Sequence, residues 1–293
     1  MQIAAFKSAT GEGLGVVVGE HIAVMHEGIE GSSETALQKL IDGGESALSE
    51  WASKSATAKQ VSLSDVTLLP PVVSRRAAII CVGKNYHAHA REFFGSGFDS
   101  TGKDEIPTEA VIFGKMGSSL VGHGENINAS LDPTNTVDYE GELAIIIGKE
   151  AHKVAREDAF NFIFGYTVCN DVTSRELQKR HNQWLLGKSL DSFCPLGPWI
   201  VTKEEVGDIT KQTLTTTVNG EERQCASIAD LIFDIPGLIE TLSATMTLQP
   251  GDIIATGTPA GVGIGHKPPK YLAPGDRVEV TVTGIGTLAN SVI

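Results

Sequence analysis

The sequence is poor in the residues that define several common protein classes. It contains only four cysteines, widely spaced and without a CxxC pair, which argues against a disulfide-stapled scaffold and against zinc held by cysteine and histidine. Its aliphatic runs fall far short of the ~20 residues that a membrane-spanning helix needs. Its first residues lack a basic segment followed by a long apolar stretch, so no signal peptide is expected. These absences predict a cytoplasmic protein with no membrane partner.

Basic side chains are scarce as well. The 293 residues include 23 Lys and Arg against 36 Asp and Glu, a formal net charge of −13. Such an excess of acid repels nucleic acid and anionic membrane surfaces, so no nucleic-acid partner is expected. Hydrophobic residues make up 41% of the chain, which is enough for a packed core. The surplus carboxylates raise the question of whether some of them converge on a metal ion.

Motifs for nucleotide binding and for covalent catalysis are missing too. The Gly-rich run from Thr256 to Gly265 fits neither GxxxxGK[ST] nor a GxGxxG between a strand and a helix. There is no GxSxG elbow for a nucleophilic serine. The run is typical instead of a loop whose backbone approaches a ligand closely, with Thr258 as a hydroxyl contact.

Strand-like segments outnumber helical ones, which predicts an α+β protein that is mostly β. Alternating apolar and polar positions over 1–25 predict a short β-meander, and Ser and Thr caps with apolar spacing of three to four predict a helix over 32–56. A Pro-Pro break then predicts a domain boundary. We expect a small N-terminal α+β domain over 1–70 and a main domain over 71–293.

The main domain is predicted to contain a hairpin and two longer helices. Asn219-Gly220 between two polar and apolar alternating runs is a strong hairpin-turn signal. Apolar spacing predicts helices over 156–165 and over 228–246.

Two glutamates two residues apart, Glu140 and Glu142, open the aliphatic run Leu143–Ile147. Side chains two apart on a strand point to the same face. Two carboxylates that enter a core repel each other unless a cation or a proton lies between them, although a solvated sheet edge is the alternative. Asp171 ends a second apolar run and would complete a three-carboxylate site for Mg²⁺ or Mn²⁺; it would alternatively cap the helix that follows.

A histidine and a glutamate three residues apart, His89 and Glu92, would share one face of a short helix. A carboxylate beside an imidazole raises the pKa of the imidazole and orients the ring, which is how a general base is commonly built. The alternative is an ordinary surface pair. The polar, Gly-rich stretch 95–107 follows this helix and favours a lid that orders on substrate binding.

Three further polar side chains lie close to Asp171 in the sequence. Arg175 and Gln178 are three apart and would hold a carboxylate from one helical face. Lys188 lies in a small-residue setting and would bind an anionic oxygen or pair with the acids of the metal site. For each of the three, a solvent-exposed position is the alternative.

Five motifs occur in an order that is far more specific than any one of them. They are GKNYxxHxxE, DYEGELAIIIGK, GYTVCNDVTSRELQ, GKSLDSFCPLGPWIVT and LQPGDIIATGTPAGVG. In this order they resemble the fumarylacetoacetate hydrolase family, in its smaller bacterial branch, over about residues 71–293. Residues 1–70 resemble the variable N-terminal appendage of that branch.

The resemblance implies a mixed β-sandwich roll that forms a homodimer. It also implies metal binding by Glu140, Glu142 and Asp171, with Mg²⁺ or Mn²⁺ as the cofactor. The family's other functional residues map onto catalytic His89, Glu92 and Lys188 and onto substrate-binding Arg175, Gln178 and Thr258. One position departs from the family: Lys115 is followed by Met116 where many relatives have proline, so no role is assigned to Lys115. The role of His87, a second imidazole in the same helix, is open.

The family's substrates imply a small 2-oxo or 2,4-dioxo acid. The leading expectation is hydrolysis of the C–C bond of an acylpyruvate, such as fumarylpyruvate or maleylpyruvate, to pyruvate and a second acid. Decarboxylation of an oxaloacetate-like acid and isomerisation of an oxo-dienoate use the same site and stay open. A non-catalytic protein stabilised by a structural cation is a remoter alternative, which the presence of a His-Glu pair disfavours.

Overall fold

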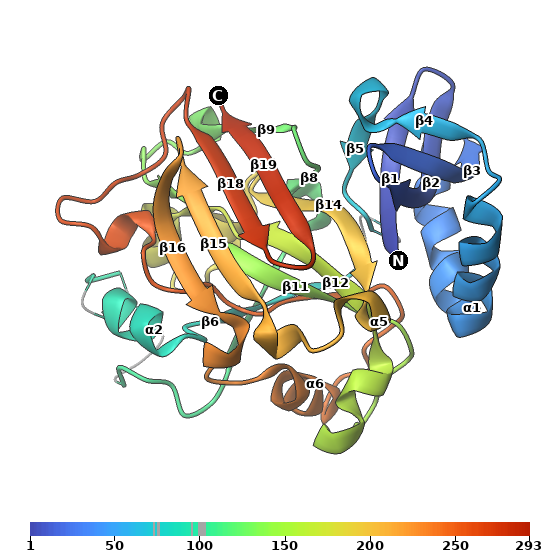
Figure 1. The fold of residues 1–293 in the computed structure, drawn as a ribbon. Helices are drawn as coiled ribbons and strands as arrows, with labels where there is room; N and C mark the ends of the chain where they lie inside the picture. The colour runs from blue at the N-terminus through green and yellow to red at the C-terminus, as the bar shows by residue number, and fades with distance from the viewer. Residues whose placement is uncertain (73, 75–76, 95, 99–103) are drawn as a thin grey trace.

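The computed structural model describes residues 1–72, 74, 77–94, 96–98 and 104–293, and Figure 1 shows how their elements are arranged. Among these residues the largest sheet has the order β4-β3-β2-β1-β14-β12-β11-β17-β6-β7, with β5 beside β1 and β8 beside β14. A second sheet has the order β16-β15-β18-β19-β9, and β10 pairs with β13.

The bounds of the strands, in chain order, are β1 Gln2–Ser8, β2 Gly11–Val18, β3 His21–Gly28, β4 Gln60–Ser62, β5 Thr67–Leu69, β6 Ile79–Gly83, β7 Val111–Lys115, β8 Leu120–Val121, β9 Asn126–Ile127, β10 Val137–Asp138, β11 Gly141–Ile147, β12 Ile163–Asn170, β13 Thr173–Ser174, β14 Cys194–Thr202, β15 Thr213–Val218, β16 Glu221–Ser227, β17 Ile253–Ala255, β18 Arg277–Val282 and β19 Gly286–Val292. The α-helices are α1 Ser32–Ser55, α2 His87–Phe94, α3 Arg175–Arg180, α4 Leu185–Lys188, α5 Lys203–Val206 and α6 Ile235–Ser243. The 3₁₀-helices are η1 Leu63–Asp65, η2 Gly117–Ser119, η3 Ala129–Leu131, η4 Arg156–Phe162, η5 Ile209–Lys211, η6 Ile228–Asp230 and η7 Gly263–Gly265.

Strand β11 is buried on both faces, and this explains its uninterrupted aliphatic sequence. Leu143 and Ile145 belong to the core formed with the second sheet, whereas Ala144 and Ile146 belong to a core that includes residues of β1 and α1. Alternate side chains of a strand point to opposite faces, so each face of β11 packs against a different layer. A strand that is covered twice in this way needs apolar residues throughout.

The predicted mostly-β fold class is confirmed, and several predicted elements lie where expected. The predicted meander is β1 to β3, and the predicted helix over 32–56 is α1. The hairpin of β15 and β16 turns at Asn219 and Gly220, whose φ angles of 53° and 79° are those of the primed turns that suit a two-residue hairpin.

Both long helices predicted in the main domain are wrong in extent. Residues 156–162 form only the 3₁₀-helix η4, and from Ile163 the chain is already strand β12. The segment 228–246 is helical without interruption only over α6, because Asp234 caps that helix at Gly237 N and a proline occupies its first turn. The backbone before the cap is used elsewhere, since Phe233 bonds through both its N–H and its carbonyl to Asn85.

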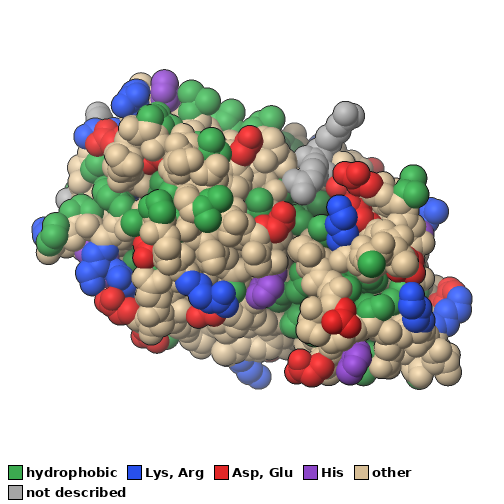
Figure 2. Space-filling view, turned by 90° about the horizontal axis from the view of Figure 1, so that it is seen from above, with side chains coloured by type: hydrophobic (Ala, Val, Ile, Leu, Met, Phe, Trp, Pro, Cys, Tyr) green, Lys and Arg blue, Asp and Glu red, His purple; other side chains and the backbone are tan. Residues whose placement is uncertain are grey.

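The predicted domain boundary falls between β5 and β6 and stays a prediction. Within the described part of the chain, none of the helices combines the length and the apolar character that a membrane span requires. On the face seen in Figure 2, acidic side chains are scattered among basic and apolar ones. Most of the surplus acids on this face are therefore ordinary solvated groups.

Candidate active site

The three carboxylates predicted to share a site, Glu140, Glu142 and Asp171, are brought together by the pairing of β11 with β12. In this antiparallel pair Gly141 lies opposite Asn170, so Glu140 and Asp171 flank the same end of the ladder. Their backbones are linked by a bond of 2.8 Å from Asp171 N to Glu140 O. One oxygen from each of the three side chains lies within 4.8 Å of the others, and all three residues are buried. Asp171 does not cap helix α3, whose N-cap is Ser174.

Lys188 forms ion pairs with two of these three acids. The ammonium of Lys188 lies 2.7 Å from Glu140 Oε2 and 2.7 Å from Asp171 Oδ2. Glu142 accepts a hydrogen bond of 2.9 Å from Gly257 N, and among the described residues no ion pair reaches it. Burial and the charges of Asp171 and Glu140 therefore raise the pKa of Glu142 well above its ordinary value.

Glu140 shows the opposite balance. Burial alone would raise its pKa, but Lys188 and Arg175 outweigh that effect and lower the pKa below its ordinary value. Within the described residues, Glu142 is thus the one acid of the three that forms no ion pair. Buried carboxylates with oxygens in mutual reach form the hard donor set that Mg²⁺ and Mn²⁺ prefer, and such a cation would supply the compensation that Glu142 lacks. The residues present fit a divalent cation held by Glu140, Glu142 and Asp171.

Lys115, to which the sequence assigned no role, is part of this charge cluster. Its buried ammonium lies 2.7 Å from Asp171 Oδ1 and donates to the carbonyls of Val172 and Lys188. Burial lowers the pKa of Lys115, yet the charge of Asp171 outweighs this and raises it above its ordinary value. A lysine that ends an apolar strand, as in VIFGK, is the signal that could have pointed to it.

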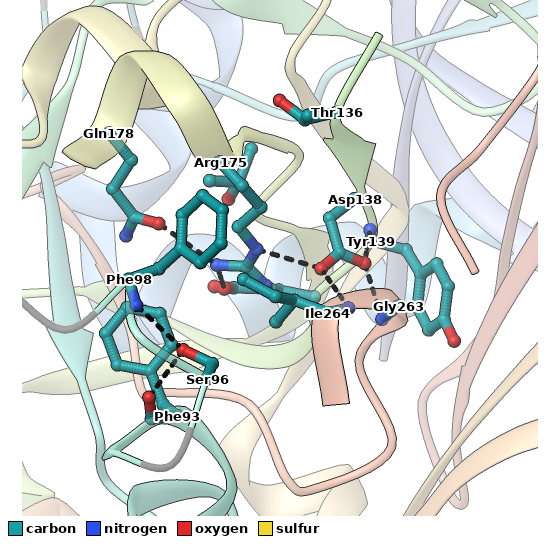
Figure 3. Close-up of polar contacts among 12 residues, drawn as sticks. Phe93, Ser96, Phe98, Thr136, Asp138, Tyr139, Arg175, Gln178, Gly263 and Ile264 are labelled. Carbon is teal, nitrogen blue, oxygen red and sulfur yellow. Dashed lines mark hydrogen bonds and ion pairs between the residues drawn. The ribbon is translucent and has the colours of Figure 1, made fainter. Parts of the chain in front are cut away.

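Arg175 is buried and held by three acceptors on two of its nitrogens (Figure 3). Nε donates to Asp138 Oδ2 at 2.8 Å, while Nη1 lies 2.6 Å from Glu140 Oε1 and 3.2 Å from Gln178 Oε1. The third nitrogen, Nη2, is buried and has no hydrogen-bond partner among the described residues. The structure therefore joins Arg175 and Gln178 as their spacing predicts, and leaves one guanidinium donor for an anion. The sequence predicts no role for Asp138, because Arg175, Gly263 and Ile264 lie far from it along the chain.

His89 and Glu92 form the predicted contact on helix α2, with His89 Nδ1 3.2 Å from Glu92 Oε2. His89 is 4% exposed, so the pair is not a surface interaction. Glu92 also accepts hydrogen bonds of 3.0 and 3.2 Å from Gly261 N. The carboxylate is therefore fixed between the imidazole and the Gly-rich loop.

One cavity connects these groups. The empty space between its walls, including the part open to solvent, measures about 260 Å³. Its lining includes two of the three acids, the imidazole and the predicted substrate contacts: Glu140, Glu142, His89, Arg175, Gln178, Lys188 and Thr258. Thr258 is 2% exposed, and its Oγ1 accepts from Gln224 Nε2 at 2.7 Å. Asp171 and Glu92 reach the cavity through the side chains that they contact, Lys188 and His89.

Two expectations next to α2 have different outcomes. His87 is exposed and lines a separate surface groove together with Arg91, so the structure does not bring it to the cavity. The predicted lid over 95–107 includes residues 95 and 99–103, which lie outside the described residues.

A family model described as "Fumarylacetoacetate (FAA) hydrolase C-terminal" matches residues 78–293. The chain therefore belongs to the fumarylacetoacetate hydrolase family, and the predicted family is confirmed. It is an enzyme of that family acting on a small molecule.

Three relatives define its surroundings within the family. The chain is 47% identical over 248 residues to oxaloacetate tautomerase YisK of Bacillus subtilis (strain 168), covering 84% of this chain and 80% of that protein. The structure of fumarylacetoacetate hydrolase from psychrophilic Exiguobacterium antarcticum superposes with a TM-score of 0.82 at 38% identity, covering 100% of this chain and 99% of that one. Maleylpyruvate hydrolase from Sphingobium sp. SYK-6, in complex with manganese (II) ion and pyruvate, gives a TM-score of 0.80 at 34% identity with the same coverage.

Proposed function

We propose that this protein is a divalent-cation-dependent enzyme that interconverts the keto and enol forms of a small 2-oxo dicarboxylic acid of the oxaloacetate type. The observation that carries the proposal is that one small cavity joins an acid cluster that fits a divalent cation with a buried His-Glu pair. The lining of the cavity, which includes Glu140, Arg175 and Lys188, is charged and polar, which favours a short acid with several oxygens. The 47% identity to an oxaloacetate tautomerase supports the same choice.

The acids of the cluster define where a 2-oxo acid would bind. Glu140, Glu142 and Asp171 would hold a Mg²⁺ or Mn²⁺ ion, which would supply Lewis-acid chemistry at the 2-oxo group of the substrate. Arg175 would receive the substrate carboxylate, because its buried Nη2 has no hydrogen-bond partner within the described part of the chain and charge-assisted bonds to carboxylates are strong. Gln178 and Thr258 line the same cavity and would orient the remaining oxygens.

His89 is the proposed acid-base group. Because Nδ1 contacts Glu92, Nε2 is the nitrogen that takes the proton from C3 of the substrate. Glu92 stabilises the imidazolium that forms. The C3–H bond is broken, and the 2-oxo oxygen gains a proton either from solvent or from Lys188, which then takes a proton back from solvent. His89 returns its proton to solvent, so that the reaction is a net proton shift.

Hydrolysis of an acylpyruvate such as maleylpyruvate or fumarylpyruvate is the second candidate, and the likeness to maleylpyruvate hydrolase favours it. In that reaction His89 Nε2 takes a proton from water, the hydroxide adds to the distal carbonyl, the C–C bond breaks, and the departing carbon receives the proton. The products are pyruvate and a second acid. The two candidates differ in whether His89 acts on carbon or on water.

The experiment is to remove metal, restore Mn²⁺ or Mg²⁺, and supply oxaloacetate and maleylpyruvate separately. Faster relaxation of the oxaloacetate enol absorbance, without loss of carbon, supports tautomerisation. Pyruvate with a second acid from maleylpyruvate supports hydrolysis, while pyruvate with CO₂ from oxaloacetate indicates decarboxylation. If the metal-loaded protein accelerates none of these reactions, the proposal fails.

The two histidines of α2 provide a matched pair of variants. We expect His89→Gln to reduce turnover by about 10²-fold or more, the scale of general acid-base catalysis, with Mn²⁺ affinity unchanged. His87→Gln, which alters an exposed side chain on the same helix, should leave turnover within about twofold. Equal effects of the two substitutions would remove His89 from the mechanism.

A homodimer and a cytoplasmic location stay predictions.

A further inference from the structure

The carboxylate of Asp138 is saturated by donors from three separate parts of the chain. It is fully buried and accepts from Arg175 Nε at 2.8 Å and from Ile264 N at 3.0 Å through Oδ2. Its other oxygen, Oδ1, accepts from Gly263 N at 2.6 Å and from Tyr139 N at 2.9 Å. Figure 3 shows this carboxylate between the guanidinium and the backbone of the Gly-rich loop. With both oxygens occupied, Asp138 has no acceptor left for a substrate, so its effect must pass through its partners.

The first partner is the proposed substrate anchor. Asp138 fixes Nε of Arg175, and Glu140 with Gln178 fixes Nη1. A planar guanidinium held on two nitrogens has its third nitrogen aimed in one direction only. Asp138 therefore helps to set the orientation of Nη2, the nitrogen that has no hydrogen-bond partner among the residues that the structure describes.

The second partner is the loop that holds the acid-base pair. Gly261 N donates to both oxygens of Glu92, and Gly261 lies two residues before the Gly263 N–H that Asp138 holds. At Gly265 a Cβ atom would lie 1.9 Å from Glu92 Oε1 and 2.3 Å from Glu92 Cδ. The position of Glu92 therefore depends on the backbone conformation of the segment 261–265.

A direct contact links the same two regions. The ring of Phe93, on helix α2, lies 5.8 Å from the Cζ atom of Arg175 and stacks at 5.9 Å on the imidazole of His89. A cation over an aromatic face is attracted to it. The helix that carries the acid-base pair therefore touches the substrate anchor on one side and the Gly-rich loop on the other.

We propose that Asp138 is a positioning residue that couples Arg175 to the seating of helix α2, so that the anchoring of a substrate carboxylate and the alignment of His89 and Glu92 stabilise each other through the segment 261–265. The proposal rests on the proposed function for the identity of the anion, but the coupling itself is a property of the free protein. A purely structural aspartate would contribute to folding without joining the two regions. Coupling between sites is reciprocal, and this makes the two possibilities distinguishable.

The test uses Asp138→Asn with Asp132→Asn as the matched control. Asp132 is another buried aspartate, bonded to Thr134, Thr136 and Ser174, and among the described residues it accepts nothing from Arg175 or from 261–265. In the metal-free protein we expect Asp138→Asn to speed amide hydrogen exchange in α2 by roughly tenfold or more, the scale set by losing a charge-assisted hydrogen bond. The control should leave exchange in α2 within about threefold of the parent protein.

The second arm uses Mn²⁺-loaded protein and pyruvate as the probe. Pyruvate should slow exchange in α2 of the parent protein, and Asp138→Asn should both abolish that effect and raise the Kd for pyruvate by about tenfold or more. Unchanged α2 exchange and an unchanged pyruvate Kd in a folded Asp138→Asn variant would overturn the coupling. If the parent protein fails to bind pyruvate, the assignment of Arg175 as the anchor of a 2-oxo acid is refuted, the proposed function is judged from its own turnover assays, and the coupling is judged from the metal-free arm.

A second variant covers the case in which Asp138→Asn does not fold. Gly265→Ala leaves Asp138 and Arg175 intact but places a methyl group where the Glu92 carboxylate now lies. Because coupling is reciprocal, this variant should have a higher Kd for pyruvate and faster amide hydrogen exchange in α2, although residue 265 does not line the cavity. A pyruvate Kd and α2 exchange equal to those of the parent protein would overturn the proposal.

Discussion

Replacing Lys115 with methionine tests whether the acid site is balanced by its own lysines when no metal is bound. The substitution keeps the length of the side chain and removes a buried charge that lies 2.7 Å from Asp171. Breaking a buried ion pair by removing one partner costs about 3–5 kcal/mol, because the other charge is left without compensation. Asp171 keeps Lys188 at 2.7 Å, so the lower end, about 3 kcal/mol, is expected.

The same substitution should cost less once a divalent cation is bound. The ion compensates Asp171 in place of Lys115, and the repulsion between the lysine and the ion is gone. By linkage, a variant whose metal-bound form is destabilised less must bind the metal more tightly. We expect Lys115→Met to bind Mn²⁺ roughly tenfold more tightly, which corresponds to ~1.4 kcal/mol.

The assay is urea unfolding with and without saturating Mn²⁺, together with Mn²⁺ titration calorimetry. Lys211→Met is the control, since Lys211 forms an ion pair with Asp208 at 3.5 Å and its side chain is 78% exposed. Exposed pairs contribute about 0–1 kcal/mol, so this control should be nearly silent in both conditions. A Lys115→Met protein as stable as the parent without metal, or one that binds Mn²⁺ more weakly, would refute the reasoning.

Two further predictions concern the proton on Glu142 and the packing of Gly187 against Gln178. Because the pKa of Glu142 is raised above 4.5 in the folded metal-free protein, stability falls as pH rises from about that value through the raised pKa, and Mn²⁺ binding within this window displaces a proton. Calorimetry in buffers of different ionisation enthalpy should detect this release and an Mn²⁺ affinity that rises with pH; no proton release would contradict it. At Gly187 a Cβ atom would lie 2.4 Å from Gln178 N, so Gly187→Ala should displace Lys188, lower the unfolding midpoint and reduce turnover. Parent-like values of both would count against this contact.

Short sequence patterns predict which side chains belong to the site. They do not predict the strand pairing that brings those side chains together. The two-residue spacing predicts that Glu140 and Glu142 share a face, and the three-residue spacing predicts the contact of His89 with Glu92. Both depend only on the periodicity of a strand or a helix. That Asp171 lies beside Glu140 depends on the register of β11 against β12, which packing on both faces of the sheet determines.

The roles of Lys115 and Asp138 could not be assigned for the same physical reason. Lys115 contacts a carboxylate 56 residues later in the chain, and Asp138 receives N–H groups 125 and 126 residues away. No pattern within a short window of sequence contains such a contact. The prediction of a continuous helix over 228–246 is wrong for another reason. The side chain of Asn85 forms hydrogen bonds with the N–H and the carbonyl of Phe233, and a continuous helix would need both groups.

The parallel pairing of β6 with β17 has a consequence for the order in which the molecule folds. Ile79 lies opposite Ile253, and Cys81 lies opposite Ala255, so these two neighbours in the sheet are far apart along the chain. Pairings between distant segments form slowly, because the entropy of closing the intervening chain must be overcome before any contact rewards it. Helix α2 follows β6 and the Gly-rich loop follows β17, so His89 and Glu92 acquire their setting only when the two strands meet. A chain that ends before residue 265 would therefore lack the complete setting of the acid-base pair.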